Sequence, residues 1–357
     1  MKKGLLLVPF MTGKGGTETV IHNLFGVLGK DNSSKYSIKL YSIGGSVDYE
    51  WASTVSDIDI KWISKSRFLR TLFYLTCLPA LIFGIIRKEK PDFIISTNPI
   101  MWFLSYRIVH LLSLNTKVVS WYHYSLDKKP VKKFILQSAD YYLAISSAIR
   151  NELIQNGICK RKIFTIYNPI TTNQKTIPRP TDDACFIYLG RLDLDGQKNL
   201  SELLDACSLL KGNWSLSLYG DDTNAKDIYS YANHKDILNH ISFKGFVNEP
   251  WSKIAKASAM ILCSKYEGYP MVLAEALSHG VFCITSNIEG STELVNRNNG
   301  RIYESGNYKE LASIMQSIIN NSLVLPTQSM IQDTVTQLLP DHYSKRFNES
   351  IEKILGI

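Results

Sequence analysis

The sequence predicts an α/β protein made of two Rossmann-like domains, each with a parallel sheet covered by helices. The chain has 357 residues, a length that suits two domains. Continuous apolar runs rich in β-branched residues alternate with amphipathic stretches of helical length, as in parallel sheets that are buried on both faces. A polar, proline-containing stretch at 168–183 interrupts this alternation near the middle and indicates a linker.

The expected strands form two series, one on each side of this linker. Six precede it, at 4–10, 36–43, 57–63, 92–97, 117–121 and 141–146. Five follow it, at 184–190, 214–220, 240–245, 259–264 and 281–286. The domains are therefore expected over 1–170 and 171–339.

The apolar segment 68–86 approaches the roughly 20 residues that span a bilayer, but it contains Arg70, Pro79 and Gly84. We expect a helix buried in, or docked at the rim of, the first domain. A helix lying on a membrane surface is the alternative, because basic residues stand at both ends of the segment: Lys65, Arg67, Arg70, Arg87 and Lys88.

Composition excludes several classes of protein. With 45% hydrophobic and 20% charged residues the chain is globular rather than disordered or fibrous. Its six cysteines form no Cys-x-x-Cys pair, which argues against a zinc ribbon, a disulfide framework and a thioredoxin motif and favours reduced cytosolic thiols. The apolar run before Pro9 is too short for a signal-peptide core, so secretion is not expected.

The net charge of +8 is unevenly distributed. Residues 1–170 hold 23 Lys and Arg against 11 Asp and Glu, whereas the remainder is net acidic. The first half is therefore expected to face an anionic partner such as a membrane surface or a phosphorylated substrate, although clustered solubility charge would look the same. Nucleic acid is not expected, because the cations are not interleaved with aromatics in a recognisable module.

A glycine-rich turn follows the first expected strand, over 12–19. Gly15 and Gly16 would let the backbone approach a phosphate at the start of a helix. The turn is neither G-x-G-x-x-G, because Glu18 stands where glycine is required, nor a P-loop. A purely structural tight turn would need glycine as well.

A second motif is the segment from Glu267 to Gly280. Pro270 and Gly280 bracket a helix over 270–279. Glu267 then precedes the helix, Glu275 lies inside it, and free amides near 271–273 would face an anion. A helix-capping role for Glu267 alone is the simpler alternative.

A third motif, Gly190-Arg191-Leu192, directly follows the first strand of the second domain, with Lys198 close behind. Ligands bind beyond the carboxyl ends of strands in open α/β sheets. A guanidinium fork and an ammonium there suit a pyrophosphate, although two ordinary surface cations are also possible.

These three elements, in this order, resemble the retaining GT-B glycosyltransferases of group 1 (family 4), and the resemblance spans nearly the whole chain. Its most specific mark is the Glu-x7-Glu pair, Glu267 and Glu275. The resemblance implies an acceptor-side N-terminal domain, a nucleotide-sugar-binding C-terminal domain facing it across a cleft, and a terminal helix over 340–357 that crosses back to the first domain. Segments 121–129, 139–149 and 190–199 are similar to galactosyltransferases of the bacterial lipopolysaccharide core.

The resemblance also implies roles for single residues. Arg191 and Lys198 would hold the diphosphate and stabilise the departing UDP. Glu275 would accept hydrogen bonds from the ribose, and Glu267 would bind the hexose. The remaining implied donor contacts are the backbone of Tyr269, Pro270, Met271, Val272 and Leu273, the loop glycines Gly15 and Gly16, His123 at the transferred sugar, and Gly220, Phe246 and Val247 around the base.

The resemblance further implies a metal-independent enzyme whose substrate is a UDP-sugar and whose transfer retains the anomeric configuration by same-face substitution. Asp193-x-Asp195 is interpreted as an accidental match to a metal motif. The favoured reaction moves galactose to lipopolysaccharide core at the inner face of the cytoplasmic membrane. The alternatives are UDP-glucose or UDP-N-acetylhexosamine transfer in capsule, exopolysaccharide or teichoic-acid assembly, and a non-catalytic anion-binding protein.

Overall fold

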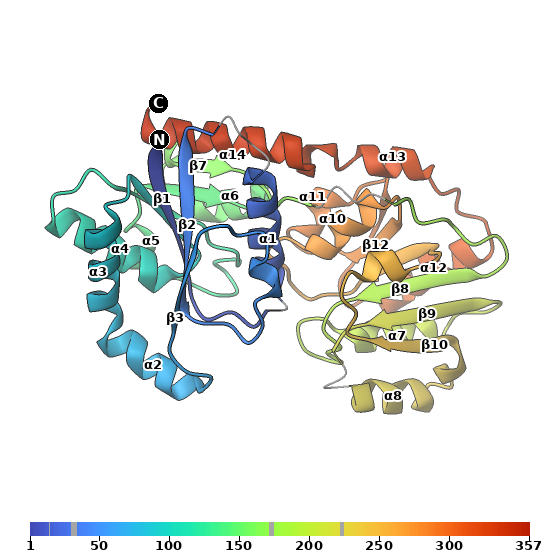
Figure 1. Ribbon diagram of the computed structural model, residues 1–357. Coiled ribbons are helices and arrows are strands. Elements are labelled where there is room, and N and C mark those ends of the chain that lie inside the picture. Colours follow the sequence, from blue (N-terminus) through green and yellow to red (C-terminus); the bar gives the residue numbers. More distant parts are fainter. Residues whose placement is uncertain (14, 30–33, 171–174, 222–224) are drawn as a thin grey trace. The chain divides into compact units, whose positions relative to one another are not determined.

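The computed structural model describes residues 1–13, 15–29, 34–170, 175–221 and 225–357 (Figure 1). The chain divides into two compact units. Unit 1 comprises Met1–Pro169 together with Pro340–Ile357, and unit 2 comprises Ile170–Leu339. The division falls within the predicted linker 168–183, of which residues 171–174 lie outside the described residues.

Unit 1 contains a seven-stranded parallel sheet in the order β3-β2-β1-β4-β5-β6-β7. Strand β1 is an interior strand and is buried from Gly4 to Val8, and its Leu6 lies in register with Leu40 on one side and Ile95 on the other. This burial on both faces explains the continuous apolar runs. The strands are β1 (Lys2–Val8), β2 (Tyr36–Gly44), β3 (Ile58–Trp62), β4 (Phe93–Ser96), β5 (Lys117–Ser120), β6 (Tyr141–Ala144) and β7 (Ile163–Thr165).

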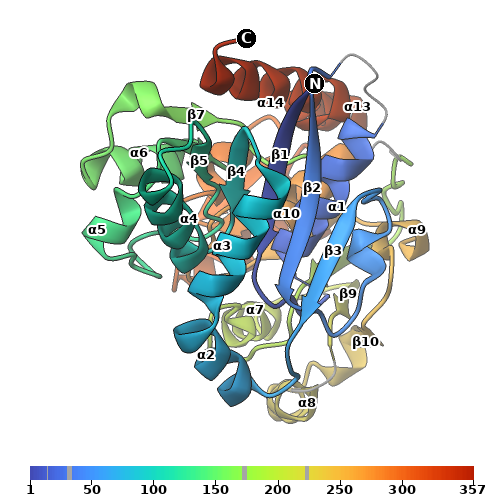
Figure 2. The same cartoon turned by 60° about the vertical axis from the view of Figure 1, so that its left-hand side comes forward.

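Helices cover both faces of this sheet, with α3 and α4 on one side and α1 on the other (Figures 1 and 2). The C-terminal helix α14 packs on α1 and buries Tyr343, Phe347 and Ile351, so the chain returns to unit 1 as predicted. The helices are α1 (Gly16–Leu28), α2 (Arg67–Thr76), α3 (Leu78–Glu89), α4 (Pro99–Leu111), α5 (Lys133–Leu136), α6 (Ser147–Gln155) and α14 (Pro340–Leu355).

The segment 68–86 is not the single helix that the sequence analysis predicted. It forms α2 and α3, which meet at Cys77 with a bend of 64°. Pro79 in the first turn of α3 accounts for the break, because proline cannot continue the preceding helix. No described helix is by itself long and apolar enough to cross a membrane, although α2 and α3 reach that length and composition together.

Unit 2 contains a six-stranded parallel sheet in the order β10-β9-β8-β11-β12-β13. Its strands are β8 (Ala184–Leu189), β9 (Trp214–Tyr219), β10 (Ile241–Gly245), β11 (Ala259–Leu262), β12 (Phe282–Ser286) and β13 (Gly300–Tyr303). Helix α7 contacts α8 and α12, whereas α10 contacts α11 and α13. The helices are α7 (Leu200–Cys207), α8 (Ala225–His234), α9 (Pro250–Lys253), α10 (Met271–Ser278), α11 (Ser291–Leu294), α12 (Tyr308–Ile319) and α13 (Gln328–Asp333).

The predicted fold class is confirmed, and every predicted strand is present with its ends within two residues of the expected ones. Two strands, β7 and β13, were not predicted. Both lie at a sheet edge and are short, with three and four residues. Short strands of mixed burial lack the apolar run on which the prediction depended.

Strand order reverses once in each sheet, between β1 and β4 in unit 1 and between β8 and β11 in unit 2. Neighbouring crossovers leave in opposite directions at such a point, so a crevice opens beyond the carboxyl ends of the two strands. These two positions are where ligand-binding residues are expected.

Candidate active site

The reversal point of unit 2 brings together two motifs that are far apart in the sequence. The loop after β8 carries Arg191 and Lys198, and the loop after β11 carries Ser264 and Glu267. The two motifs are separate in the sequence. The parallel sheet places them side by side, because β8 and β11 pair directly.

An ion pair joins the two loops. The ammonium of Lys198 lies 2.5 Å from a carboxylate oxygen of Glu267. The exposed fractions of the two side chains are only 14% and 11%. The hydroxyl of Ser264 donates to the same oxygen at 2.7 Å, a contact that the sequence analysis did not anticipate. Glu267 is therefore more than a helix cap, because its partners lie on two loops.

Arg191 is exposed beside this pair. Its guanidinium donates to the side-chain oxygen of Gln197 at 2.7 Å, and the amide of Gln197 in turn donates to the carbonyl of Tyr266 at 3.0 Å. The carbonyl of Arg191 accepts from the buried Tyr188 hydroxyl at 2.8 Å. Hydrogen bonds thus hold both the backbone and the guanidinium of Arg191, and the side chain remains exposed to solvent.

Asp193 has a structural role in the loop between the two cations. Its carboxylate accepts from the backbone amide of Gly196 at 2.9 Å and from that of Lys198 at 3.4 Å. These bonds close the turn that carries Lys198 to Glu267, which accounts for an aspartate at this position.

Helix α10 starts one residue later than predicted, with Pro270 as the residue before it and Gly280 two residues past its end. Tyr269 and Met271 are buried and Val272 is partly buried. The amide of Leu273 already donates to the carbonyl of Pro270 at 3.0 Å. Of the three amides expected to be open at this helix start, Leu273 is therefore engaged, and an anion contact depends on Met271 and Val272.

Glu275 is partly buried on α10 and accepts from the indole N–H of Trp251 at 2.8 Å. Burial raises the pKa of Glu275 to about 6, because the charged form loses its water, although the Trp251 hydrogen bond opposes this shift. Trp251 belongs to α9 and was missed by the sequence analysis. Nothing in its local sequence marks it, since only the fold brings α9 to α10.

The ends of β9 and β10 complete this edge of unit 2. The amide of Gly220 donates to the carbonyl of Gly245, and a Cβ at position 220 would stand only 2.1 Å from the carbonyl oxygen of Gly190. Glycine is therefore required at 220. Phe246 follows, with 47% of its surface exposed, and Val247 is partly buried.

In unit 1 the glycine-rich turn lies at the β1–β4 reversal point and is organised by Glu18. This buried carboxylate accepts from the backbone amides of Thr12 and Gly13 at 3.0 and 3.1 Å and from the Thr12 hydroxyl at 3.0 Å. A Cβ at Gly15 would lie 2.4 Å from Glu18, so glycine permits the carboxylate to fold back. At Gly16 a Cβ would meet no atom within 4 Å. The amides of Thr12 and Gly13 are occupied by Glu18, which limits any phosphate contact here to the turn around Gly15 and Gly16.

His123 follows β5 and is buried, with its ring 4.6 Å from that of Trp121. Burial lowers the pKa of His123 to about 3, so the imidazole is neutral at physiological pH. The Nε2 of His123, the indole nitrogen of Trp121 and the hydroxyl of Thr97, which follows β4, are all buried without a hydrogen-bond partner among the described residues. Such groups are costly unless a ligand or water satisfies them, so this edge has polar atoms available to a ligand.

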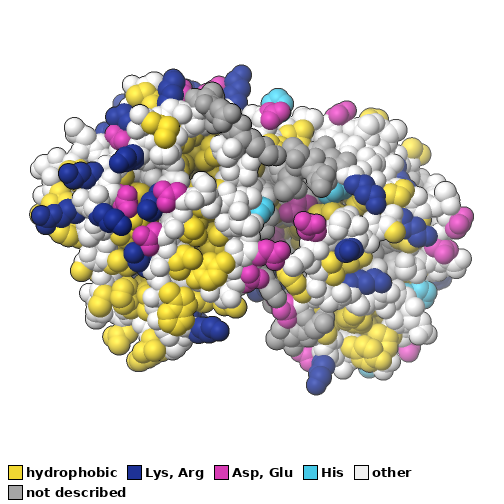
Figure 3. All heavy atoms as spheres, viewed as in Figure 1, with side chains coloured by type: hydrophobic (Ala, Val, Ile, Leu, Met, Phe, Trp, Pro, Cys, Tyr) yellow, Lys and Arg dark blue, Asp and Glu magenta, His cyan; other side chains and the backbone are white. Residues whose placement is uncertain are grey.

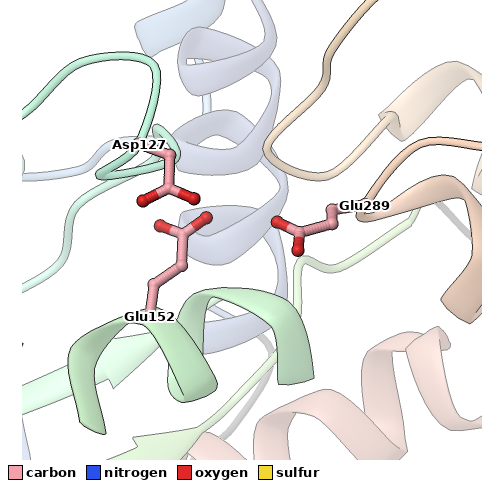
Figure 4. Close-up of side chains that lie close together, drawn as sticks. All are labelled: Asp127, Glu152 and Glu289. Carbon is pink, nitrogen blue, oxygen red and sulfur yellow. The ribbon is translucent and has the colours of Figure 1, made fainter. Parts of the chain in front are cut away.

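Glu152 holds the loop after His123. Figure 4 shows its carboxylate on α6 directed toward the loop that carries Asp127; Glu289, also drawn there, belongs to unit 2. The buried carboxylate of Glu152 accepts from the hydroxyl of Ser125 at 2.7 Å and from the amide of Leu126 at 2.5 Å. These bonds fix the start of the 123–129 loop from the side of α6.

Fold and site together define a protein of two Rossmann-like units with charged residues at a strand-reversal point, and comparisons with known proteins identify its family. Residues 169–355 match the family described as glycosyl transferases group 1, and residues 14–174 match glycosyltransferase family 4. The chain belongs to the group 1 glycosyltransferases, and its fold is GT-B.

Individual proteins that are similar to this chain are more specific than the family. The chain is 28% identical to the lipopolysaccharide 1,6-galactosyltransferase of Escherichia coli (strain K12), over 97% of this chain and 95% of that protein. It is 24% identical, over 50% of this chain and 48% of that protein, to the Escherichia coli UDP-Gal:alpha-D-GlcNAc-diphosphoundecaprenol alpha-1,3-galactosyltransferase. Among solved structures, the lipopolysaccharide outer core galactosyltransferase WaaB is similar with a TM-score of 0.84 and 27% identity, over 98% of this chain and 99% of that one.

Proposed function

We propose that the protein transfers a hexose, with galactose favoured, from a UDP-sugar to a lipid-borne glycan of the cell envelope, with retention of configuration. The observation that carries the proposal is the largely buried Lys198–Glu267 pair beside Arg191 at the reversal point of unit 2. The similarity to a lipopolysaccharide 1,6-galactosyltransferase over nearly the whole chain supports galactose and an envelope acceptor. The smaller similarity to an enzyme named for UDP-Gal and an alpha linkage supports the donor and the stereochemistry.

In this proposal the donor diphosphate lies between Arg191 and Lys198. Transfer breaks the bond between the anomeric carbon and the diphosphate oxygen, so negative charge grows on the leaving UDP. A guanidinium and an ammonium fixed in place stabilise that charge without having to reorganise. Gln197 and Glu267 hold the two cations at this position now, at 2.7 and 2.5 Å.

Glu267 then binds the hexose, and its second role is to orient Lys198. As UDP departs, the sugar acquires positive charge, and a nearby carboxylate stabilises this oxocarbenium character. Glu275 accepts hydrogen bonds from the ribose hydroxyls, while Phe246, Val247 and Gly220 line the base. The amides of Met271 and Val272 and the buried side of Tyr269 complete the donor contacts.

Unit 1 supplies the remaining contacts. Neutral His123 offers an unsatisfied ring nitrogen to a hydroxyl of the transferred sugar. Gly15 and Gly16 bring a bare backbone to the diphosphate and sugar. In this proposal the two protein cations neutralise the diphosphate, and catalysis needs no metal.

The acceptor places the enzyme at the inner face of the cytoplasmic membrane. The net positive charge of residues 1–170 supports an anionic surface as partner. Lys128, Lys129, Lys132 and Lys133 form one basic cluster that such a surface would attract.

The function is tested by measuring UDP release from UDP-galactose, UDP-glucose and two UDP-N-acetylhexosamines, each with a truncated lipopolysaccharide core as acceptor. Acceptor-dependent release with UDP-galactose is expected. Preference for another UDP-sugar would move the assignment to capsule, exopolysaccharide or teichoic-acid assembly. UDP binding without turnover of any donor would indicate a non-catalytic anion-binding protein.

Stereochemistry and metal dependence are tested on the same reaction. We expect an α-linked product by NMR and unchanged turnover in EDTA. A β-anomer would overturn retention, and complete loss of turnover on chelation would overturn the assignment of diphosphate neutralisation to Arg191 and Lys198.

A further inference from the structure

Helix α2 packs on unit 1 with its polar side and turns its apolar side outward. The hydroxyl of Tyr74 accepts from the backbone amide of Phe10 at 3.1 Å and donates to the carbonyl of Ile43 at 2.7 Å. The guanidinium of Arg70 lies 3.6 Å from the centre of the Phe10 ring and donates to the carbonyls of Ser64 and Lys65. Arg70 and Tyr74 are four residues apart, so both lie on one side of the helix.

The opposite side of α2 consists of large apolar residues. Phe68, Leu72 and Leu75 are spaced by four and three residues, and their exposed fractions are 74%, 49% and 76%. No residue of α2 is buried. Leu69 on the same helix and Trp62 at the end of β3 are also exposed, at 49% and 56%, and Figure 3 shows hydrophobic side chains gathered at the part of unit 1 where α2 lies. A water-facing helix normally has the reverse orientation.

The charge around this patch is mainly positive. Residues 60–88 hold six cationic residues and no aspartate or glutamate: Lys61, Lys65, Arg67, Arg70, Arg87 and Lys88. Two of these cations have acidic neighbours, because Lys61 lies 2.8 Å from Asp59 and Lys88 lies 3.8 Å from Glu89, so Lys65 and Arg67 are the cations that count here. Lys65 and Arg67 are exposed at the start of α2. An apolar helix face with cations at its end suits anionic headgroups above acyl chains.

We infer that α2 is the element by which unit 1 inserts into an anionic lipid surface, lying in the plane of the interface with Phe68, Leu72 and Leu75 among the acyl chains. The inference rests on the proposed function, because a lipid-borne acceptor requires the enzyme to reach a membrane. It assigns the docking to α2 together with Trp62, whereas the basic cluster at 128–133 would act by charge alone.

The neighbouring helix excludes a deeper insertion. Leu78, Ile82 and Ile86 of α3 are buried in unit 1, so the two helices cannot leave the fold together as a membrane span. Phe10, which contacts Arg70 and Tyr74 of α2, also connects this helix to the glycine-rich turn of unit 1. Phe10 directly precedes the turn that Glu18 organises, so the lipid-bound face lies close to the carboxyl edge of the sheet.

The experiment uses the full chain and vesicles of phosphatidylglycerol with phosphatidylethanolamine, compared with vesicles of phosphatidylcholine. Trp62 is an internal probe, because the other five tryptophans are buried. We expect a blue shift of tryptophan emission on the anionic vesicles only. Trp62→Phe is expected to remove the shift while vesicle binding by co-sedimentation remains.

Variants separate insertion from simple charge attraction. The double variant Phe68→Ser/Leu75→Ser is expected to lower the vesicle partition coefficient by about 100-fold, given the usual contribution of two large apolar side chains. Val324→Ser/Leu209→Ser, which changes two exposed apolar residues of unit 2, is the matched control and is expected to bind normally. Lys65→Gln/Arg67→Gln is expected to weaken binding at low salt and to reduce its salt dependence. Because all these side chains are exposed, thermal unfolding is expected to be unchanged.

Three results would overturn the inference. The first is unchanged vesicle binding by Phe68→Ser/Leu75→Ser, and the second is equal binding to neutral vesicles. The third is a dimer in light scattering that this variant dissociates, since the face would then serve self-association. A sugar-transfer assay with a delipidated, soluble acceptor distinguishes failure of the docking from failure of the proposed function. If the wild type and Phe68→Ser/Leu75→Ser both transfer sugar while neither binds vesicles, only the docking is wrong. If neither protein transfers sugar but the wild type alone binds vesicles, only the proposed function is wrong.

Discussion

The ammonium of Lys198 and the carboxylate of Glu267 lie 2.5 Å apart, on two loops that follow adjacent strands of unit 2. Both side chains are largely buried, so each charge depends on the other for compensation. Ser264 donates to the same carboxylate oxygen and fixes its orientation. The pair thus keeps a cation and an anion at the reversal point before any ligand arrives.

Removing only one charge of the Lys198–Glu267 pair is expected to destabilise unit 2. Lys198→Met leaves a largely buried carboxylate without its counter-charge; this costs about 3–5 kcal/mol in a fully buried pair, so with 14% and 11% exposure a loss of about 3 kcal/mol or less is expected. The double variant Lys198→Met/Glu267→Gln removes both charges and is expected to recover most of the stability while remaining inactive. Urea unfolding followed by tryptophan emission measures the stabilities, and Lys256→Met, at an exposed lysine of unit 2, is the control. Equal destabilisation in the single and double variants would refute mutual compensation.

The ionised carboxylate of Glu275, which is assigned to ligand binding, is expected to destabilise the folded protein. Its pKa is raised to about 6 from the ordinary 4.5, so the folded protein holds this proton more tightly than the unfolded chain does. Stability therefore falls as pH rises from 4.5 to 6 and stays lower above 6. Glu275→Gln removes the charge and is expected to raise stability at pH 8 by about 1–2 kcal/mol, with little change at pH 4.5. Denaturation at both pH values tests this; a variant less stable than wild type at pH 8 would contradict it.

His123 is expected to lower the stability of the folded protein in acid. Its ionisation is not expected to produce an inflection in the pH–rate profile. Its folded pKa of about 3 lies below the ordinary 6.5, so the unfolded chain binds the proton first and stability falls as pH drops below 6.5. At pH 5 this amounts to about 2 kcal/mol. His123→Leu is expected to lose less stability than wild type between pH 7.5 and 5, and to transfer sugar more slowly at every pH. An inflection near 6.5 in the wild-type rate profile that the variant lacks would show that the imidazole ionises in the fold.

Glu18 is expected to hold the glycine-rich turn in its shape. Glu18→Ala removes the acceptor of two amides and one hydroxyl, so hydrogen exchange at Thr12 and Gly13 is expected to accelerate by about tenfold or more. UDP affinity is expected to fall only slightly, because Gly15 and Gly16 are the only unit 1 residues assigned to the diphosphate and the other UDP contacts are assigned to unit 2, whereas transfer slows. Glu50→Ala, at an exposed glutamate of the same unit, is the control. Unchanged exchange at both amides would show that the turn does not need Glu18.

Much of this architecture was predictable from the sequence, because buried parallel strands have a strong local signature. Leu6 and Ile95 each lie in a continuous apolar run and Leu216 lies in the alternating segment 214–219, so each of these segments predicts a strand whatever its partner. The edge strands β7 and β13 were not predicted, because with three and four residues they are too short to show a pattern, whereas the five-residue edge strands β3 and β10 were predicted. The break at Cys77 was missed because Pro79 suits either a helix start or a kink, and only packing decides.

The site was predictable only where a motif is local. Arg191 and Lys198 were predicted from their position after a strand, and Glu267 from its position before a helix and from the Glu-x7-Glu pair. Their contact depends on the pairing of β8 with β11, which no local motif shows. Trp251 on Glu275 could not be predicted, because 24 residues and a sheet strand separate them. Glu18 was seen only as the residue that spoils a dinucleotide motif, whereas in the fold it accepts the hydrogen bonds that shape the turn.

The central claim is that Glu267 acts at the reacting sugar while Glu275 holds the nucleotide. The most direct test combines UDP titration by calorimetry with single-turnover transfer from UDP-galactose, for Glu267→Gln and Glu275→Ala. Glu275→Ala is expected to weaken UDP binding by about 10–150-fold, since a hydrogen bond to a charged group contributes about 1.5–3 kcal/mol. Glu267→Gln is expected to bind UDP like the wild type but to transfer about 100-fold more slowly. Normal UDP binding by Glu275→Ala together with lost UDP affinity in Glu267→Gln would contradict the assignment.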